Sequence, residues 1–282
     1  MKRITTWIFA LALLLALPLR AAEDETLPER TLKKLVAQQQ ELLAEAAKDH
    51  SKVNQDSFRT QIESVCSGYE VLLRDNPNMA EGFAAYGYLL SKLGQDKEAI
   101  RILLKANELD KDQPLVKNQI GNILAEQGHP VDALTYYLAA AKLAPKEPLY
   151  HYQIGTLLHE ARDDFLKAGE WKAEALDKAS HDAFKQAAEL APDRIEFTYR
   201  YGESFYDLDP PDWDAALKVW AALEEKAQTS LERETMRLHA ANILIKQGKT
   251  DHARIVLSTV TEKALQEQKQ KLVAQLPALP DK

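Results

Sequence analysis

The stretch from Gln119 to Pro145, QIGNILAEQGHPVDALTYYLAAAKLAP, decides the fold because an earlier part of the chain carries the same pattern. At offsets 0, 7, 12, 16 and 19 the stretch has Gly121, Gly128, Ala133, Tyr137 and Ala140. The segment AYGYLLSKLGQDKEAIRILLKANELD, residues 85–110, has Gly, Gly, Ala, Leu and Ala at the same offsets from Gly87. Gly155 follows Gly121 at the same interval at which Gly121 follows Gly87. A constant interval of this kind indicates a stack of small repeated units.

Each unit reads as two helices joined by a tight turn. Ile120, Ile123 and Leu124 recur at the three- and four-residue spacing of one helical face. Gly128 then ends the first helix and Pro130 begins the second, since glycine favours the end of a helix and proline its first turn. The pattern therefore predicts an all-α chain of helix-turn-helix repeats.

The repeat continues with distortions towards the C-terminus. The copy that contains Gly155 reaches Phe184 only at offset 29, where the regular copies have the matching side chain at offset 16, which indicates a 13-residue insertion. The next copy has two extra residues at Pro210-Pro211, and the last has Ala241 in place of the glycine. The organisation we expect is a leader at 1–21, a helix at 22–49, a degenerate repeat at 46–79, repeats at 80–113, 114–147, 148–194, 195–230 and 234–267, and a tail at 268–282.

The repeats resemble the tetratricopeptide repeat (TPR) family. The 114–147 copy carries the family pattern at Gly121, Leu124, Ala133, Tyr137, Ala140 and Pro145, and the 80–113 copy has Lys111 where the family has proline. The resemblance covers residues 80–267 firmly and 46–79 weakly. It implies a right-handed α-solenoid whose first helices line a concave face that binds a protein or peptide partner.

The same resemblance selects the residues expected to face that groove. They are the fifth, sixth and ninth positions of each copy, and the candidates among them are Tyr88, Asn118, Gln119, Asn122, Tyr152, Thr156, Tyr199, Arg200 and Asn242. Arg200 is the one cation among the fifteen positions if His239 is neutral, so a clamp for a carboxylate tail is not expected. A neutral groove of tyrosines and amides suits an extended peptide or a helix.

The insertion and the N-terminal region each leave two interpretations open. Phe165 and Trp171 in the insertion either anchor a partner or cover their own helices. The stretch 29–48 has an apolar stripe at Leu32, Leu35, Leu42 and Leu43, which either caps the solenoid or pairs with a second copy in a homo-oligomer.

Residues 1–21 have the layout of a secretory signal peptide: a basic start at Lys2 and Arg3, then an apolar run from Ile4 to Leu17. The run is short for a bilayer span, so we expect cleavage and no stable membrane span afterwards, although a retained anchor is the alternative. The sequence thus predicts an exported protein, periplasmic or secreted.

Charge and motifs argue against several function classes. The formal net charge of −7 and the absence of a basic strip argue against nucleic-acid binding. His151 and His159 are eight residues apart, not the four that place two ligands on one helical face, so no metal or other cofactor is expected. We find no catalytic constellation either. The sequence predicts a non-catalytic scaffold or adaptor, with an accessory or regulatory subunit of an envelope enzyme, or a small-ligand or metal-binding protein, as alternatives.

Overall fold

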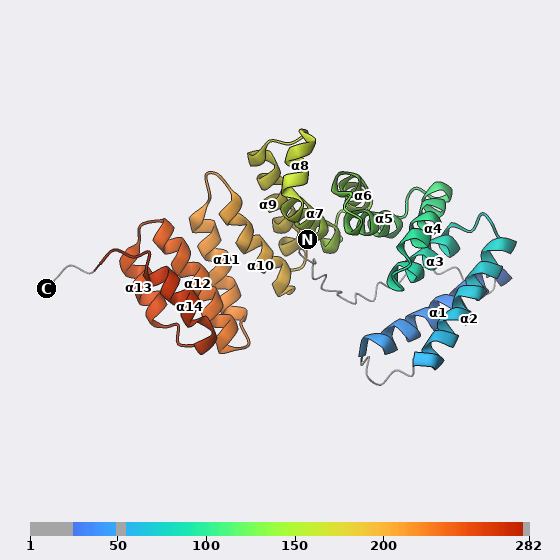
Figure 1. Ribbon diagram of the computed structural model, residues 1–282, viewed down its shortest axis with the longest axis horizontal. Helices are drawn as coiled ribbons and strands as arrows, with labels where there is room; N and C mark the ends of the chain where they lie inside the picture. The colour runs from blue at the N-terminus through green and yellow to red at the C-terminus, as the bar shows by residue number, and fades with distance from the viewer. Residues whose placement is uncertain (1–24, 49–54, 279–282) are drawn as a thin grey trace. The chain divides into compact units, whose positions relative to one another are not determined.

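A computed structural model describes residues 25–48 and 55–278 of the chain, and within them every regular element is a helix (Figure 1). The predicted all-α fold is confirmed. The signal peptide predicted at 1–21 lies outside the described residues. The chain divides into two compact units, residues 1–123 and 124–282, and the division falls inside one helix.

The described part of the first unit, residues 25–48 and 55–123, contains four helices and most of a fifth. These are α1 (Leu27–Lys48), α2 (Gln55–Asp75), α3 (Ala80–Lys92), α4 (Asp96–Leu109) and α5 (Pro114–Glu126). Helices α1 and α2 pack along each other, and so do α3 and α4. Close approach of α3 and α4 requires a glycine, since a Cβ on Gly87 would lie 2.6 Å from Cγ of Leu103.

The second unit holds the remaining elements. They are α6 (Pro130–Leu143), α7 (Pro148–Glu160), α8 (Arg162–Ala168), α9 (Ala173–Leu190), α10 (Ile195–Ser204), η1 (Phe205–Asp207), α11 (Trp213–Lys226), α12 (Ser230–Lys246), α13 (Thr250–Ser258), η2 (Lys263–Leu265) and α14 (Gln266–Val273). Helix α7 packs on α9, α10 on α9 and α11, and α12 on α11 and α13 (Figure 1). Helices α10 and α12 are the first helices of their repeats. Each therefore lies between the second helix of the preceding repeat and the second helix of its own.

Left-handed glycines make the tight turns between paired helices. Gly128 has a φ of 80°, and the next N–H, that of His129, donates to the Leu124 carbonyl at 2.8 Å. This hydrogen bond satisfies a carbonyl that the end of the helix leaves open. Gly94 and Gly248 occupy the same place in their repeats, with φ of 71° and 73°. The turn predicted between Gly128 and Pro130 is present.

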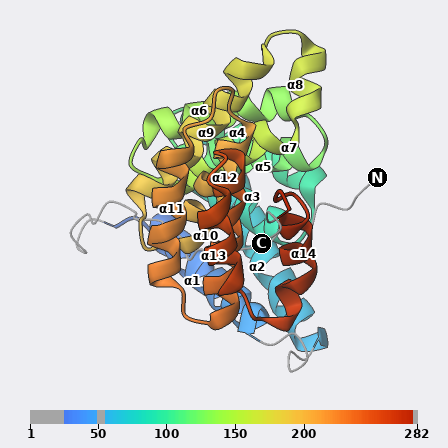
Figure 2. The same ribbon diagram turned by 90° about the vertical axis from the view of Figure 1, so that its left-hand side faces the viewer.

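The insertion forms a short helical hairpin on the α7/α9 pair. It supplies α8, a left-handed turn at Gly169, and an extension of α9, which has 18 residues against 14 in α4 and α6. Figure 2 shows α8 projecting past the ends of the neighbouring helices of its unit. Arg162 holds the hairpin to α9 through two hydrogen bonds with the Asp177 carboxylate, at 2.7 and 2.9 Å.

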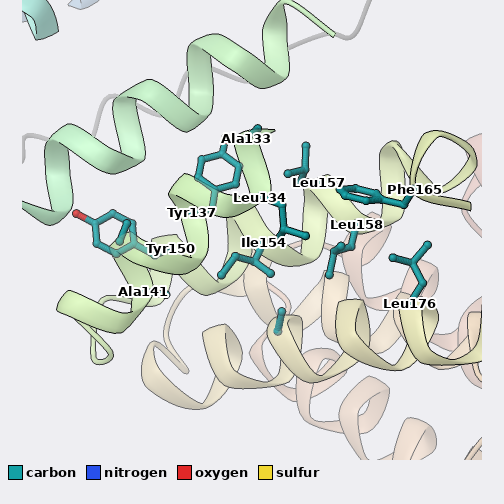
Figure 3. Close-up of a cluster of buried hydrophobic side chains, with 12 residues drawn as sticks. Ala133, Leu134, Tyr137, Ala141, Tyr150, Ile154, Leu157, Leu158, Phe165 and Leu176 are labelled. Carbon is teal, nitrogen blue, oxygen red and sulfur yellow. The ribbon is translucent and has the colours of Figure 1, made fainter. Parts of the chain in front are cut away.

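A buried cluster joins this hairpin to the helices before it. Figure 3 shows Phe165 beside Leu157 and Leu158, with Leu176 below them, and Tyr137 belongs to the same cluster. Phe165 is 1% exposed and meets the half-buried ring of Trp171 edge-on, at 6.5 Å between centroids. Of the two interpretations of Phe165, the structure therefore supports packing within the chain, because the side chain has no surface to offer a partner.

The apolar stripe of α1 is also covered within the chain. Leu32, Leu35 and Leu42 are buried, and Leu35 packs so closely on α2 that a Cβ on Gly68 would lie 2.6 Å from it. The buried Tyr69 hydroxyl donates to Gln39 Oε1 at 2.7 Å. The stripe that the sequence offered to a second copy is thus largely taken up by α2. No helix in the described part of the chain is both long and apolar enough to cross a membrane.

Candidate functional site

The groove candidates of the first unit lie on α3 and α5. Tyr88 is half-buried, with the Lys92 ammonium 5.3 Å from the centre of its ring. Asn122 is also half-buried, whereas Asn118 and Gln119 are 2% and 6% exposed. This corrects the prediction that Asn118 and Gln119 face the groove. Helix α5 also buries Val116, Ile120 and Ile123, so it is covered on more than one face. Asn118 and Gln119 therefore present little surface to a partner.

In the second unit, the candidates on α7 and α10 meet around one phenylalanine. The ring of Tyr152 contacts Phe184 edge-on and Phe197 at 4.6 Å between centroids. The Arg200 guanidinium also lies over Phe184, 5.1 Å from the centre of its ring. Thr156 lies beside the Tyr152 hydroxyl, one turn along α7. Burial raises the pKa of Tyr152, so its hydroxyl stays protonated.

Arg200 is also fixed by a carboxylate on its own helix. Its Nη1 donates to Glu203 Oε2 at 2.9 Å, and both side chains are partly exposed. Such an exposed pair contributes little to stability but sets the direction of the guanidinium. The cation predicted for this surface is therefore neutralised in place.

The candidates on α10 and α12 converge on His239. The Tyr199 hydroxyl lies 3.0 Å from Nε2 of His239, and the Tyr206 hydroxyl lies 3.4 Å from Nδ1. The imidazole stacks flat on the buried indole of Trp220, with centroids 3.9 Å apart and an interplanar angle of 3°. Burial lowers the pKa of His239 to about 4, so the ring is neutral at pH 7.

Asn242 completes this group from one turn further along α12. Its side chain hydrogen-bonds the Tyr206 hydroxyl, and burial raises the pKa of that hydroxyl to about 12. Trp213 contacts the Tyr206 ring at 5.5 Å, and the Lys246 ammonium lies 5.8 Å from the centre of the Trp213 ring. Leu238, another position that repeat register assigned to the groove, is instead buried against Ala241 and Leu257.

Sequence reasoning missed Tyr206 and Trp213. Both flank the loop with the extra prolines, where the register of the repeat is broken, so counting positions did not reach them. The available signal was the group of aromatic residues, Phe205, Tyr206 and Trp213, on either side of the two prolines.

We call first-helix surface the set of partly exposed side chains that α7, α10 with η1, and α12 bring together: Tyr152, Thr156, Tyr199, Arg200, Glu203, Tyr206, His239 and Asn242.

His151 and His159, which the sequence analysis considered as metal ligands, contact different groups. Nε2 of His151 lies 2.9 Å from the Pro145 carbonyl, and Nδ1 of His159 lies 3.1 Å from Asp207 on η1. Among the residues that the structure describes, no group of three or more His, Cys, Asp or Glu side chains is placed to hold a metal ion.

A shallow hollow of about 420 Å³ lies between α11 and α12, away from the first-helix surface. Ala221, Glu224, Glu225 and Arg233 line it. The Glu224 carboxylate is already engaged by Arg237, whose Nε donates to it at 2.7 Å. Three of its four lining side chains are charged, so the hollow is not the mostly apolar, enclosing kind of pocket that binds small molecules.

Comparison with known proteins agrees with this architecture. The tetratricopeptide repeat family model matches residues 80–113. YrrB, described as a TPR protein with an unusual peptide-binding site, superposes with a TM-score of 0.61 at 16% identity, covering 73% of this chain and 97% of its own.

Two further solved structures have the same fold at low identity. PilF of Pseudomonas aeruginosa gives a TM-score of 0.58 at 14% identity, over 88% of this chain and 99% of its own. MamA of Desulfovibrio magneticus RS-1, from residue 41 to its end, gives 0.51 at 17% identity, over 71% and 98%. The sequence has no significant match among curated proteins. The chain is an all-α protein with the tetratricopeptide-repeat fold, and its residues 80–113 form a recognisable tetratricopeptide repeat.

Proposed function

We propose that the chain is a non-catalytic scaffold or adaptor of the cell envelope that binds a partner peptide or helix on its first-helix surface. The observation that carries this proposal is that two groups of side chains lie on one series of helices in the second unit. Tyr152 and Arg200 meet at Phe184. Tyr199, Tyr206 and Asn242 gather around His239. Tyrosine side chains combine apolar area with a hydrogen-bonding tip, which is typical of surfaces that bind proteins.

The rigidity of the surface supports the same function. Its rings rest on the buried Phe184, Phe197 and Trp220, so their positions are set before a partner arrives. A surface that is ordered in the free protein loses less side-chain entropy on binding. The likeness to YrrB, whose description names a peptide-binding site, is consistent with a peptide partner.

Export is the second part of the proposal. It is supported by the basic start, the apolar run from Ile4 to Leu17 and the polar residues that follow. A fusion of residues 1–40 to alkaline phosphatase, which is active only outside the bacterial cytoplasm, tests it. We expect phosphatase activity from the fusion and none when Leu13, Leu14 and Leu15 are all replaced by aspartate.

Capture of partners from an envelope fraction tests the binding function. The purified chain is compared with the Tyr152→Ala/Asn242→Ala double variant, and both are first checked for helical content and a cooperative unfolding transition. A control carries Tyr136→Ala on α6 and Gln268→Ala on α14, outside the first-helix surface. We expect a partner retained by wild type and control and lost from the double variant. Equal capture by all three proteins shows that the surface is not the binding site.

A further inference from the structure

We propose that the part of the first-helix surface formed by Tyr199, Tyr206, Glu203 and Asn242 receives a lysine or arginine side chain of the partner segment. The inference rests on the proposed binding function and adds the chemistry of the partner. On this part of the surface the hydrogen-bond donors are engaged within the chain, whereas several acceptors remain for a partner.

We assign the single proton of the neutral His239 ring to Nδ1, which gives each hydrogen bond around the ring a direction. The Tyr206 hydroxyl donates to the carbonyl oxygen of His239 at 3.4 Å. With the ring proton on Nδ1, the Tyr206 oxygen accepts from Nδ1–H of His239, at 3.4 Å. Since a neutral imidazole has one N–H, Nε2 is an acceptor, and the Tyr199 hydroxyl donates to it at 3.0 Å.

The neighbouring donors are used in the same inward direction. Asn242 hydrogen-bonds the Tyr206 hydroxyl, whose own proton is directed to the His239 carbonyl, so the Asn242 amide group is the donor. Arg200 Nη1 donates to Glu203 Oε2. Within the described part of the chain, these contacts leave acceptors: the lone pairs of the Tyr199 oxygen, the amide oxygen of Asn242 and the second oxygen of Glu203. Ammonium and guanidinium groups match such a patch because they carry donors and no acceptor.

The charges around the two tyrosines favour a cation as well. After burial, the Glu203 carboxylate is the main influence that raises the pKa of Tyr199, and it also raises the pKa of Tyr206. Glu203 thus contributes a negative potential at both hydroxyls. Arg200 opposes it at Tyr199 but is paired with Glu203, and Lys246 lies at the outer edge, over the ring of Trp213.

Aromatic rings supply the remaining attraction. Tyr199, Tyr206 and Trp213 are partly exposed, and a cation over a ring face is attracted to its π electrons. Lys246 already uses the ring of Trp213 in this way from within the chain. A partner side chain that enters between Tyr199 and Asn242 would meet acceptors, ring faces and a carboxylate together.

Selection of random dodecapeptides displayed on phage, with the immobilised full chain as target, tests the inference without a known partner. We expect peptides that share a lysine or arginine and that lose binding to the Tyr152→Ala/Asn242→Ala variant. Replacing the shared arginine by citrulline, or the shared lysine by norleucine, removes the charge and nearly keeps the shape. The Kd from calorimetry should rise about tenfold or more, because hydrogen bonds to charged groups are the strong ones.

Substitutions in the chain then locate the cation. Glu203→Gln and Tyr199→Phe should weaken the charged peptide about tenfold and the neutral peptide much less, so that the two changes are coupled. Lys246→Gln should strengthen the charged peptide by a few-fold, because it removes a nearby like charge. Matched controls on second helices, Glu225→Gln and Tyr136→Phe, should leave both Kd values unchanged. Conservative changes of this kind keep the rings in place, and thermal unfolding of each variant confirms the fold.

The outcomes separate the inference from the function on which it rests. Peptides that bind the first-helix surface but contain no shared basic residue, or are acidic, overturn the inference and leave the function standing. If no peptide binds, or if every bound peptide ignores the Tyr152→Ala/Asn242→Ala change, the assigned surface and the inference both fall.

Discussion

Gly155 of α7 lies against the ring of Phe184 of α9 so closely that a methyl group added to the glycine would be 2.8 Å from Cδ1 of the phenylalanine. The Gly155 carbonyl also accepts a hydrogen bond from the Ser180 hydroxyl at 2.9 Å. The Phe184 ring in turn contacts the ring of Tyr152 and the guanidinium of Arg200, both on the first-helix surface. Gly155 thus sets the distance between α7 and α9, and with it the position of the Phe184 ring that Tyr152 and Arg200 contact.

Gly155→Ala should therefore destabilise the protein by about 1–2 kcal/mol. Overpacking of a full core costs about 1–3 kcal/mol, and the better helix propensity of alanine returns up to about 1 kcal/mol. Urea unfolding of Gly155→Ala, Phe184→Leu and the double variant measures the coupling between the two positions. We expect the double variant to be more stable than the sum of the single losses predicts. An unchanged or higher stability of Gly155→Ala would contradict the close contact.

We expect the protein to lose stability in mild acid, because burial favours the neutral form of His239. Its pKa is about 4 in the folded chain and about 6.5 when unfolded, so the unfolded chain binds the proton first. The free energy of unfolding should fall as the pH drops from about 6.5 to about 4, by up to about 3 kcal/mol, with no further loss from this group below that pH.

Urea unfolding at pH 7, 5.5 and 4.5 measures this effect as the difference between wild type and His239→Gln. The glutamine variant should show the weaker pH dependence. The same substitution at the exposed His252 should leave the dependence unchanged. Parallel curves for wild type and His239→Gln would show that the imidazole is not buried as described.

Glu234 on α12 anchors the segment that leads to α14. Its carboxylate accepts hydrogen bonds from the backbone N–H groups of Thr261 and Glu262, each at 2.6 Å, and from the Thr261 hydroxyl. These bonds, that from Glu262 first, lower its pKa, so their contribution is present above about pH 4.5 and is lost as the pH falls through the lowered pKa.

Glu234→Gln should cost about 1–3 kcal/mol, because an amide has one acceptor oxygen and turns an N–H group towards these donors. Hydrogen exchange should speed up at the amides of Thr261 and Glu262 and change little in α7 and α9. Glu225→Gln, at an exposed position of α11, serves as the control. Unchanged exchange at both amides would argue against the anchor.

Phe165→Ala should unfold the hairpin locally. Removing a buried phenylalanine costs about 3–5 kcal/mol, which is large for a short hairpin that Phe165, the partly buried Leu166 and Trp171, and the Arg162–Asp177 pair hold in place. Trypsin should cleave faster after Lys167 and Lys172, while the far-ultraviolet circular dichroism changes little. Trp171→Ala, at a half-buried position, should have the smaller effect. Loss of partner capture in a Phe165→Ala protein whose remaining helices are intact would revive a binding role for the hairpin.

The helix pairs were predictable because local chemistry determines them. Gly128 and Pro130 mark a turn in any context, and the spacing of Ile120, Ile123 and Leu124 gives the helical face, so the fold followed from a short stretch. Repeat register also placed Tyr199 and His239 on the same surface, and the structure joins them by a hydrogen bond.

Register did not predict which of the slots are covered. Asn118, Gln119 and Leu238 occupy the same kinds of slot as Tyr152 and Asn242, yet they are buried, because coverage depends on neighbouring helices and not on position within a repeat. Tyr206 and Trp213 show the opposite case, since an irregular loop brought two rings to the surface where the repeat pattern had no position for them.

The hairpin made by α8 and the start of α9 enters between two helices that still pack as in an uninterrupted repeat. Gly155 keeps its contact with Phe184 although the insertion lengthens the connection between them. The turn at Gly169 is exposed and is not part of the α7/α9 contact. It is therefore a site at which an epitope tag, a fluorescent protein or new chain termini can be placed while the first-helix surface keeps its geometry.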